Sequence, residues 1–370
     1  MKEQVESRYF VEAAAKVLDV LESFNGQDEE LSITEIARRT GSTYSSAFRL
    51  LYTLQKRGYV MRLAGKKRYL LTPERYGFRI GYAALQTSKF HQEVTWRIVV
   101  AARRLAIALV VKTNDEFNVS KALLNADELL AEKIDLLIEY QYSETASHLI
   151  AAKCHDAGVP SIAINIAQPG AYYFGGNNYA TGALAGDFLS QFAKMHWKGR
   201  ADVLLILPAK GLVSTQEARK TGLMDSLKKG LPGLRASDVL FAPPGLTARE
   251  GYAITNKMLR EVGGLSKRIL IATLTDSLGI GAERAIQEGG LEDQAVIIGQ
   301  GAGRDARARI KKGGSFKASV AFFPECYGDR VMTLAVKVLG GQQVPLASYT
   351  NHAVLTAENL KEYYPDGDHP

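Results

Sequence analysis

Apolar residues recur at helical spacing twice within residues 31–60, which read LSITEIARRTGSTYSSAFRLLYTLQKRGYV. The two runs lie on either side of Gly41 and consist of Ile33, Ile36 and Ala37, then Ala47, Leu50, Leu51 and Leu54. Ser32 precedes the first run with Glu35 three residues later, which is the spacing of a capping box. The second run can be capped by Ser42 or Thr43. Both segments have a start signal, and the pattern predicts helix, tight turn, helix.

One face of the second predicted helix is taken up by packing. The residues left facing outward near its N-terminus are Thr43, Tyr44, Ser46 and Arg49. Side chains of these types suit contacts in a DNA groove, so we expect this helix to read DNA and Arg49 to contact it.

Two short alternating segments follow, and we predict strands over Tyr59 to Leu63 and Arg68 to Leu71. Gly65-Lys66-Lys67 would be the basic tip of the hairpin that joins them. The whole arrangement predicts a winged helix-turn-helix. Lys66 and Lys67 are expected to contact phosphate groups from the wing, and Arg68 belongs to the same predicted DNA-binding set.

The charge of this region is one-sided. Eleven basic residues lie between positions 38 and 79, and Glu74 is the only acid among them. Such a surface binds a duplex by releasing counterions. The alternative is a small helical domain whose lysines and arginines are merely solvated, but caps, turn and charge agree on DNA binding.

The stretch from Ala14 to Arg75 resembles the winged helix-turn-helix of the isocitrate lyase regulator (IclR) family, through TEIARRTG, SSAFRLLYTLQKRGYV and KKRYLL. The resemblance implies a DNA-binding role. It departs where that family has a Pro-Lys pair, because Thr43-Tyr44 stand there, and this affects the operator sequence rather than the fold. An amphipathic helix over Val11 to Phe24 should pack under the other two helices or pair with its twin.

Beyond the wing, short apolar runs alternate with helix-length segments. Strands are predicted at Arg79–Leu85, Ala108–Lys112, Ile134–Ile138, Ser161–Ile166, Asp202–Leu207, Val239–Phe241, Ile269–Thr273, Val296–Ile298 and Phe316–Ala321. Helices are predicted at Phe90–Ala106, Val119–Lys133, Glu144–Ala157, Ala180–Met195, Thr215–Lys229, Ala248–Val262 and Leu278–Glu288. Repeated strand-helix-strand units predict an α/β fold of parallel sheets covered by helices. We expect a DNA-binding domain over 1–78 and a two-lobed domain over 79–370.

Ligands of such sheets bind outside the carboxyl ends of the strands. The residues there are Gln86, Thr87, Ser88, Phe90, Asn114, Glu139, Tyr140, Gln141, Asn165, Asn177, Asn178, Thr275, Asp276, Gln300 and Gly301. Amides, hydroxyls and aromatic rings suit a small polyol or carbohydrate. Ser88, Asn178 and Asp276 also stand where helix N-caps belong, so capping is an alternative role.

This larger part of the chain resembles the periplasmic sugar-binding protein fold that lac-repressor-type regulators also use. The resemblance rests on LLNADELLAEKIDLLIEYQ, AGVPSIAINI, FGGNNYATGALAGDFL, TDSLGIGAERAIQEGG and TAENLKEYY. It implies an effector held by Ser88, Phe90, His91 and Asn165 on one side and by Arg219, Thr275 and Asp276 on the other, and Asn114 is expected beside the first group. Ribose-type binders have Asp-Arg at Asn165-Ile166, Asp at Gly301 and Gln at Phe322, so a simple free aldose is not implied.

Composition narrows the class of protein. The 370 residues are 46% hydrophobic and 23% charged, which is ordinary for a globular protein, and the net charge of +7 fits a nucleic-acid binder. The longest apolar run, Ile98 to Val111, is interrupted by two arginines, and the first ten residues lack the apolar segment of a signal peptide. Cys154 and Cys326 form no CxxC. We expect a cytoplasmic protein with free thiols and no membrane contact.

Signals of other chemistry are weak. Residues 299–303, GQGAG, miss the spacing of a dinucleotide fingerprint, and His148, Cys154 and His155 lack the further ligands of a metal site. No motif nominates a nucleophile, so neither cofactor nor metal is expected and an enzyme is the poorer hypothesis. We favour a homodimeric transcriptional regulator that binds operator DNA and a sugar, polyol or sugar derivative. The alternative is a non-regulatory solute-binding protein or an enzyme acting on a small polar metabolite.

Overall fold

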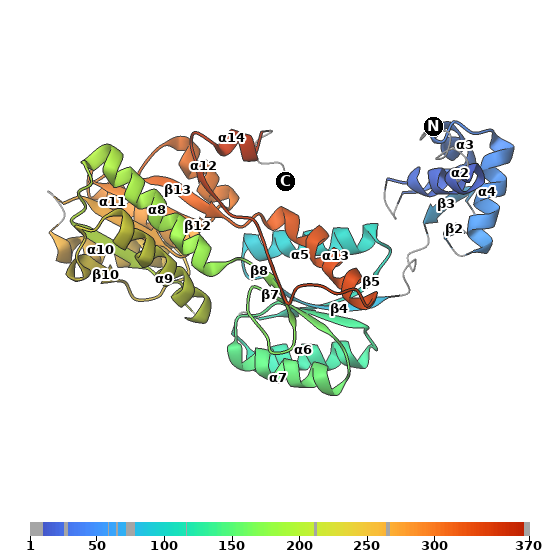
Figure 1. The fold of residues 1–370 in the computed structure, drawn as a ribbon, viewed down its shortest axis with the longest axis horizontal. Helices are drawn as coiled ribbons and strands as arrows, with labels where there is room; N and C mark the ends of the chain where they lie inside the picture. Colours follow the sequence, from blue (N-terminus) through green and yellow to red (C-terminus); the bar gives the residue numbers. More distant parts are fainter. Residues whose placement is uncertain are drawn as a thin grey trace, which may run out of the picture.

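The computed structural model describes residues 10–25, 29–57, 59–63, 66–71, 78–115, 117–210, 213–263 and 267–365, apart from the side chains of residues 213 and 214. In chain order it comprises a small helical part with a three-stranded sheet and then two α/β lobes (Figure 1). Within these ranges, no helix is long and apolar enough to cross a membrane. The predicted fold class is confirmed.

The N-terminal part has helices α2 (Glu12–Glu22), α3 (Ile33–Arg39) and α4 (Tyr44–Lys56) and strands β1 (Leu31–Ser32), β2 (Val60–Arg62) and β3 (Arg68–Leu71). The strands form an antiparallel sheet in the order β1-β3-β2. One core joins all three helices to the wing, and its fully buried members include Val20, Ile36, Ala47 and Leu51. The prediction of a winged helix-turn-helix is confirmed, although the hairpin-tip residue Gly65 lies outside the described residues.

Lobe 1 is built around a parallel six-stranded sheet in the order β14-β8-β7-β6-β4-β5. Its strands are β4 (Arg79–Leu85), β5 (Ala108–Asn114), β6 (Leu136–Glu139), β7 (Ser161–Ile164), β8 (Tyr172–Gly175) and β14 (Ala347–Tyr349). Helices α5 (Lys89–Arg104) and α13 (Tyr327–Leu339) cover one face, and α6 (Val119–Ala131) and α7 (Glu144–Asp156) cover the other (Figure 1).

Lobe 2 has a six-stranded sheet in the order β10-β9-β11-β12-β13-β15, with β15 antiparallel to β13. Its strands are β9 (Val203–Leu207), β10 (Val239–Phe241), β11 (Ile269–Thr273), β12 (Ala295–Gly301), β13 (Phe316–Ala321) and β15 (Ala353–Thr356). Helices α8 (Asn178–Trp197) and α9 (Val213–Gly230) cover one face, and α10 (Ala248–Val262), α11 (Asp276–Glu288) and α12 (Arg304–Lys312) cover the other. The short helices η1 (Ala236–Asp238) and α14 (Leu360–Tyr363) complete it, and η3 (Pro324–Cys326) lies between β13 and α13.

The chain passes between the lobes three times, because β8 leads into α8, β13 leads through η3 into α13, and β14 leads into β15. These crossovers explain part of what sequence periodicity missed. Strands β8, β14 and β15 and helices α12 and α13 were not predicted, and α13 and β14 return to lobe 1 after a long excursion through lobe 2. The predicted strand over Ser161–Ile166 ends at Ile164, because Asn165 has a left-handed backbone with φ of 62°. The predicted strand over Ile134–Ile138 begins only at Leu136.

Helices α8 and α9 pack unusually closely through glycine. A Cβ on Gly182 would stand 1.8 Å from the carbonyl oxygen of Arg219, and one on Gly222 would stand 2.0 Å from the carbonyl oxygen of Tyr179. Only a residue without a side chain allows the two backbones to approach this far. The seam therefore fixes where α9 presents Arg219.

Candidate ligand site and DNA-binding face

The helix-turn-helix has the start signals that the sequence predicts. Ser32 and Glu35 form a capping box at α3, and the Thr43 hydroxyl accepts a hydrogen bond from the Ser46 amide at 3.2 Å, which caps α4. Thr43 is therefore the cap, rather than Ser42. Thr43, Tyr44 and Arg49 are exposed and Ser46 is half-buried, so the predicted reading face is available to a partner.

The surface charge of the DNA-binding part is less uniformly positive than the sequence of residues 38–79 predicts, because acids from outside this range pair with three of the basic residues. Lys66 pairs with Glu30 at 3.0 Å, Arg68 pairs with Glu35 at 3.1 Å, and Arg39 pairs with Glu29 at 2.7 Å. These acids precede residue 38 in the chain. Glu30 and Glu35 contact the wing, whereas Glu29 contacts Arg39 of α3. Lys67 is exposed and has no ion pair among the described residues, as is true of Arg49. We therefore rank Lys67 above Lys66 and Arg68 for phosphate contact.

Three aromatic residues on α4 form an exposed stripe that we did not predict from the sequence. Tyr44, Phe48 and Tyr52 are spaced four residues apart and are 59%, 47% and 53% exposed. The rings of Phe48 and Tyr52 stack with centroids 6.5 Å apart. Their spacing alone would have revealed a stripe beside the reading face.

Arg219 of α9 stands where lobe 2 faces lobe 1. Its Nε donates to Oδ1 of Asn178 at 2.8 Å, and its Nη1 donates to the carbonyl oxygen of Leu274 at 3.1 Å. The guanidinium lies over the ring of Phe322, 4.9 Å from the centroid. Burial lowers the pKa of Arg219 below its usual value, although the group remains a cation. These bonds hold the guanidinium plane in one orientation.

Aromatic rings from lobe 1 meet Phe322, which lies in the second crossover. Phe90 of α5 packs edge-on against Phe322 at 6.4 Å and against Tyr327 of α13 at 5.9 Å between centroids. We call Phe90, Asn165, Arg219, Phe322 and Tyr327 the inter-lobe cluster. It combines apolar ring surface with hydrogen-bonding groups, which is the composition of a carbohydrate site.

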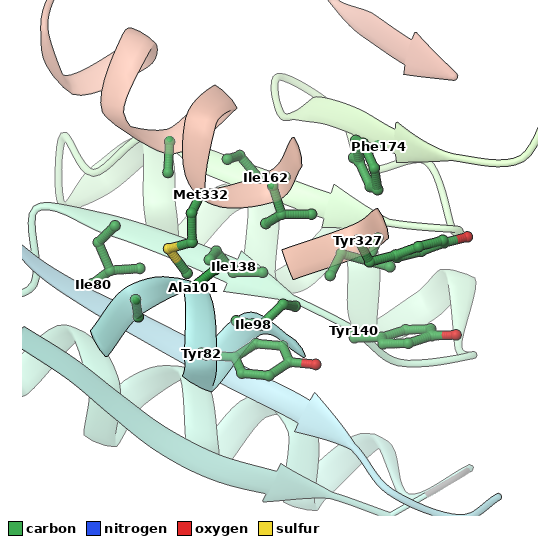
Figure 2. Packing of buried hydrophobic residues seen from close by; sticks show 14 of the residues in the cluster. Ile80, Tyr82, Ile98, Ala101, Ile138, Tyr140, Ile162, Phe174, Tyr327 and Met332 are labelled. Atoms are coloured by element: carbon green, nitrogen blue, oxygen red, sulfur yellow. The ribbon is translucent and has the colours of Figure 1, made fainter. Parts of the chain in front are cut away.

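Asn165 joins this cluster through two tyrosine hydroxyls. Its side-chain amide donates to the Tyr140 hydroxyl at 2.9 Å and accepts from the Tyr327 hydroxyl at 3.2 Å. Figure 2 shows both tyrosine rings in the lobe 1 core with their hydroxyl groups pointing out of it on the same side. Burial raises the pKa of both hydroxyls, so they stay protonated and can donate.

Thr275 and Asp276 begin α11 on the lobe 2 side. The Thr275 hydroxyl is buried and has no hydrogen-bond partner among the described residues. Asp276 accepts from the Ser319 hydroxyl at 2.6 Å and from the Gly303 amide at 2.8 Å. Thr275 therefore has bonding capacity left for a ligand, whereas Asp276 is held within its own lobe, where burial raises its pKa to about 6.

Of the three residues for which helix capping was the alternative role, Ser88, Asn178 and Asp276, only Ser88 caps a helix. The Ser88 hydroxyl accepts from the His91 amide at 3.3 Å and caps α5. Asn178 and Asp276 do not cap: Asn177 caps α8, and no side chain caps α11. Asn178 is instead the partner of Arg219.

His91 lies inside lobe 1 with only 4% of its surface exposed. Its Nδ1 bonds the Thr87 hydroxyl at 2.9 Å, and its Nε2 bonds the Tyr142 hydroxyl. Burial lowers the pKa of His91 to about 4, so the ring is neutral near pH 7. Its predicted ligand contact stays a prediction, and the structure gives it the role of orienting Tyr142.

Asn114 lies inside lobe 1, and its predicted ligand contact stays a prediction. It is 1% exposed, and its amide bonds Glu139 at 3.0 Å, the carbonyl oxygen of Tyr140 at 3.0 Å, and Asn125 at 2.8 Å. Because these bonds use its donors and its acceptor, the amide serves the lobe 1 interior. The adjacent Glu139 is fully buried, and burial raises its pKa to about 8.

His352 ties the three crossovers together. Its Nε2 accepts from the Asn177 amide at 3.0 Å in the first crossover, and its Nδ1 bonds the Ala321 carbonyl oxygen at 3.1 Å in the second. The ring also packs on Phe322 at 5.2 Å between centroids. A bond to a carbonyl requires a proton on Nδ1, so Nε2 is the acceptor and the ring is neutral. His352 was missed because it follows a strand that periodicity did not predict.

A surface depression of about 320 Å³ lies elsewhere, between β10 and α10 of lobe 2. It is lined by Phe241, Pro243, Ala253, Ile254, Lys257, Met258 and Glu261. None of the predicted ligand residues lines it. Its polar members, Lys257 and Glu261, are exposed and stand 4.0 Å apart as an ion pair, so we favour the inter-lobe cluster as the ligand site.

Comparison with known proteins agrees with this architecture. The family model of the periplasmic binding protein domain matches residues 82–343, and that of the IclR helix-turn-helix domain matches residues 13–64. Among curated proteins, the chain is similar to the ABC transporter periplasmic-binding protein YphF of Escherichia coli, with 24% identity over 292 residues that cover 73% of this chain and 85% of the relative.

Two solved structures share the fold of the lobes. One is an ABC transporter solute binding protein from Mycobacterium smegmatis with bound glycerol, at a TM-score of 0.67 and 18% identity, covering 77% of this chain and 96% of that chain. The other is an ABC transporter periplasmic solute binding protein from Actinobacillus succinogenes with bound D-allose, at a TM-score of 0.66 and 19% identity, covering 77% and 99%. The match to the periplasmic binding protein domain spans well over half of the 370 residues. This chain therefore belongs to the periplasmic binding protein domain family, and it carries an IclR helix-turn-helix domain ahead of the two lobes.

Proposed function

We propose that this protein is a transcriptional regulator whose affinity for operator DNA is set by a small carbohydrate-like ligand bound between the two lobes. The proposal rests on the presence, in one chain, of an IclR helix-turn-helix domain with an exposed helix α4 and of a two-lobed periplasmic-binding-protein fold. Transport of a solute does not require a winged helix-turn-helix. Neither the periplasmic binding protein domain nor the IclR helix-turn-helix domain is an enzyme family.

The inter-lobe cluster supports a ligand between the lobes. Phe90, Asn165 and Tyr327 belong to lobe 1, and Arg219 belongs to lobe 2. A ligand that touches both sets favours the closed arrangement of the lobes, because only closure lets it make all its contacts at once. The relatives are described with glycerol and D-allose bound, which supports a small polyol or sugar derivative here.

Closure can reach the DNA-binding part through lobe 1. Only residues 72–78 separate β3 of the wing from β4, which lies between β6 and β5 in the lobe 1 sheet. In a homodimer, movement of the lobes would change the distance between the two reading helices, and two half-sites would sense it. Phe10, Val11 and Leu18 are exposed apolar residues at and before α2, which supports pairing of that helix with its twin.

The test has a DNA arm and a ligand arm. Genomic fragments selected on the immobilised protein should yield a site with two-fold symmetry, and the protein should run as a dimer at micromolar concentration. A thermal-shift screen with glycerol, D-allose, ribose and related sugars and sugar acids should then find a ligand, since one at about 100 times its dissociation constant stabilises by roughly 2.7 kcal/mol. Arg49→Ala should bind the selected site more weakly, with relaxed sequence preference at one base pair, and keep the ligand shift.

Three results would contradict the proposal. They are DNA binding without sequence preference, a monomeric mass with and without DNA, and turnover of the bound ligand by the purified protein.

A further inference from the structure

The Arg219 guanidinium has no acidic partner in the part of the chain that the structure describes. Its hydrogen bonds go to neutral acceptors, the Asn178 amide and the Leu274 carbonyl oxygen, and its third contact is the Phe322 ring. An arginine carries five N–H groups. Two of them have these partners, so three are left for a ligand.

The acids near the same ends of the sheets are already occupied. Asp276 bonds Ser319 and Gly303, and Glu139 bonds Asn114 in the lobe 1 interior, where its raised pKa of about 8 keeps it mostly protonated near pH 7. Asp305 of α12 pairs with Lys89 of α5 at 2.8 Å, which is a second link between the lobes. None of these carboxyl groups is left to neutralise Arg219.

The remaining neighbours of Arg219 are neutral. Tyr140, Tyr142, Tyr173 and Tyr327 lie near enough to influence its pKa. Burial raises the pKa of Tyr173 to about 12 and also raises the pKa values of Tyr140 and Tyr327, so these three hydroxyls are not anions near pH 7. A desolvated cation without a counter-charge is costly, and closure of the lobes over it would increase that cost.

From this charge arrangement we infer that the effector carries an anionic group, a carboxylate or a phosphate on a small polyol or sugar, and that Arg219 binds that group. The inference rests on the proposed function, because it names the class of ligand for the same site. A planar guanidinium matches either group with paired N–H···O bonds. The unpartnered Thr275 hydroxyl follows Leu274 directly in the chain and can donate to the same anion, while Phe90 covers the apolar side of the ligand.

The experiment compares matched triads of ligands by calorimetric titration of the full-length protein. The triads are glycerol, glycerate and glycerol 3-phosphate; ribose, ribonate and ribose 5-phosphate; and glucose, gluconate and glucose 6-phosphate. In at least one triad an acid or a phosphate should bind about ten- to 100-fold more tightly than its neutral counterpart, as expected for charge-assisted hydrogen bonds in a partly buried site. The carboxylate and phosphate arms distinguish the two sources of negative charge.

Three variants locate the effect. Arg219→Gln should remove the preference for the anion, and Arg219→Lys should keep a weaker preference because it keeps the charge without the fork of N–H groups. Arg249, an exposed arginine of α10 in the same lobe, provides the control, and Arg249→Gln should bind as the wild type does. Circular dichroism confirms that each variant is folded.

A neutral member that binds as tightly as its charged counterparts would overturn the inference. So would an anion whose affinity survives Arg219→Gln, or a panel in which no anion binds. The proposed function fails separately. If a neutral sugar changed operator affinity, the proposed regulatory function would hold and the inference of an anionic effector would be wrong. If an anion bound through Arg219 without changing operator affinity, the inference would hold and the proposed function would be wrong.

Discussion

Gly182→Ala should disable the ligand response from a position that touches no ligand. The new Cβ would stand 1.8 Å from the carbonyl oxygen of Arg219, 2.7 Å from its carbonyl carbon and 2.9 Å from its Cα. All three atoms belong to the backbone, so no change of rotamer relieves the overlap. Ordinary contacts lie at about 3.5–4.0 Å, and α8 and α9 must therefore separate by roughly 2 Å.

The cost follows from that displacement. Overpacking of this kind costs about 1–3 kcal/mol, and each kcal/mol lowers the Tm of a large domain by about 2–4 °C. The same displacement would stretch the Arg219–Asn178 bond, now 2.8 Å and made between the two helices, beyond hydrogen-bonding distance. Gly182→Ala should therefore lower the Tm by about 2–12 °C and weaken ligand binding as well.

The assay is thermal unfolding followed by calorimetric titration of the ligand that the triads identify. Gly233→Ala is the matched control, because a Cβ there meets nothing within 4 Å, and its stability should change by no more than about 0.5 kcal/mol. If Gly182→Ala melted with the wild type and bound the ligand at unchanged affinity, the account of the α8–α9 seam would be wrong.

Three further predictions concern the wing, the reading helix and lobe 1. Lys67→Ala should weaken binding to all DNA sequences and reduce the slope of log affinity against log salt concentration by about one. Lys66→Ala should weaken binding less, because Glu30 already neutralises Lys66. Equal losses of affinity in the two variants would contradict the ranking of Lys67 above Lys66. Arg49→Ala should relax sequence preference at one base pair by about 1–3 kcal/mol, and an unchanged preference would exclude a base contact. The raised pKa of Glu139, about 8 against 4.5 unfolded, means that the folded state binds the extra proton, so the free energy of unfolding should fall as pH rises from about 5 to 8. Glu139→Gln should flatten that fall, and an unaltered pH profile of unfolding would contradict it.

The DNA-binding part was predictable because its determinants are local. The capping box of Ser32 and Glu35, the cap at Thr43 and the packing of Ala47, Leu51 and Leu54 are all set by residues a few positions apart. The ion pairs that reduce the positive charge of this surface were not predictable, because Glu30 and Lys66 are far apart in the sequence and meet only when the wing folds against the residues before α3.

The proposed ligand site was predictable in part for the same reason. Phe90, Asn165 and Thr275 follow strands that periodicity finds, so the rule of strand ends located them. Tyr327 and His352 follow crossovers between the lobes, and no local pattern marks those. Asn114 also stands at a strand end, yet its amide is consumed by lobe 1, a fact that depends on tertiary neighbours rather than on sequence position.

We propose that a ligand held between the lobes sets operator affinity, and fluorescence anisotropy of a labelled operator measures this coupling. The operator is the selected site, and the protein is titrated against it with and without saturating ligand, occupancy being confirmed by calorimetry. We expect the Kd for the operator to change between about five-fold and 150-fold, with its midpoint between the ligand's Kd for the free protein and its Kd for the operator-bound protein. Arg219→Gln should move this midpoint to much higher ligand concentration. An operator Kd that stays constant while the ligand site is full would contradict the claim.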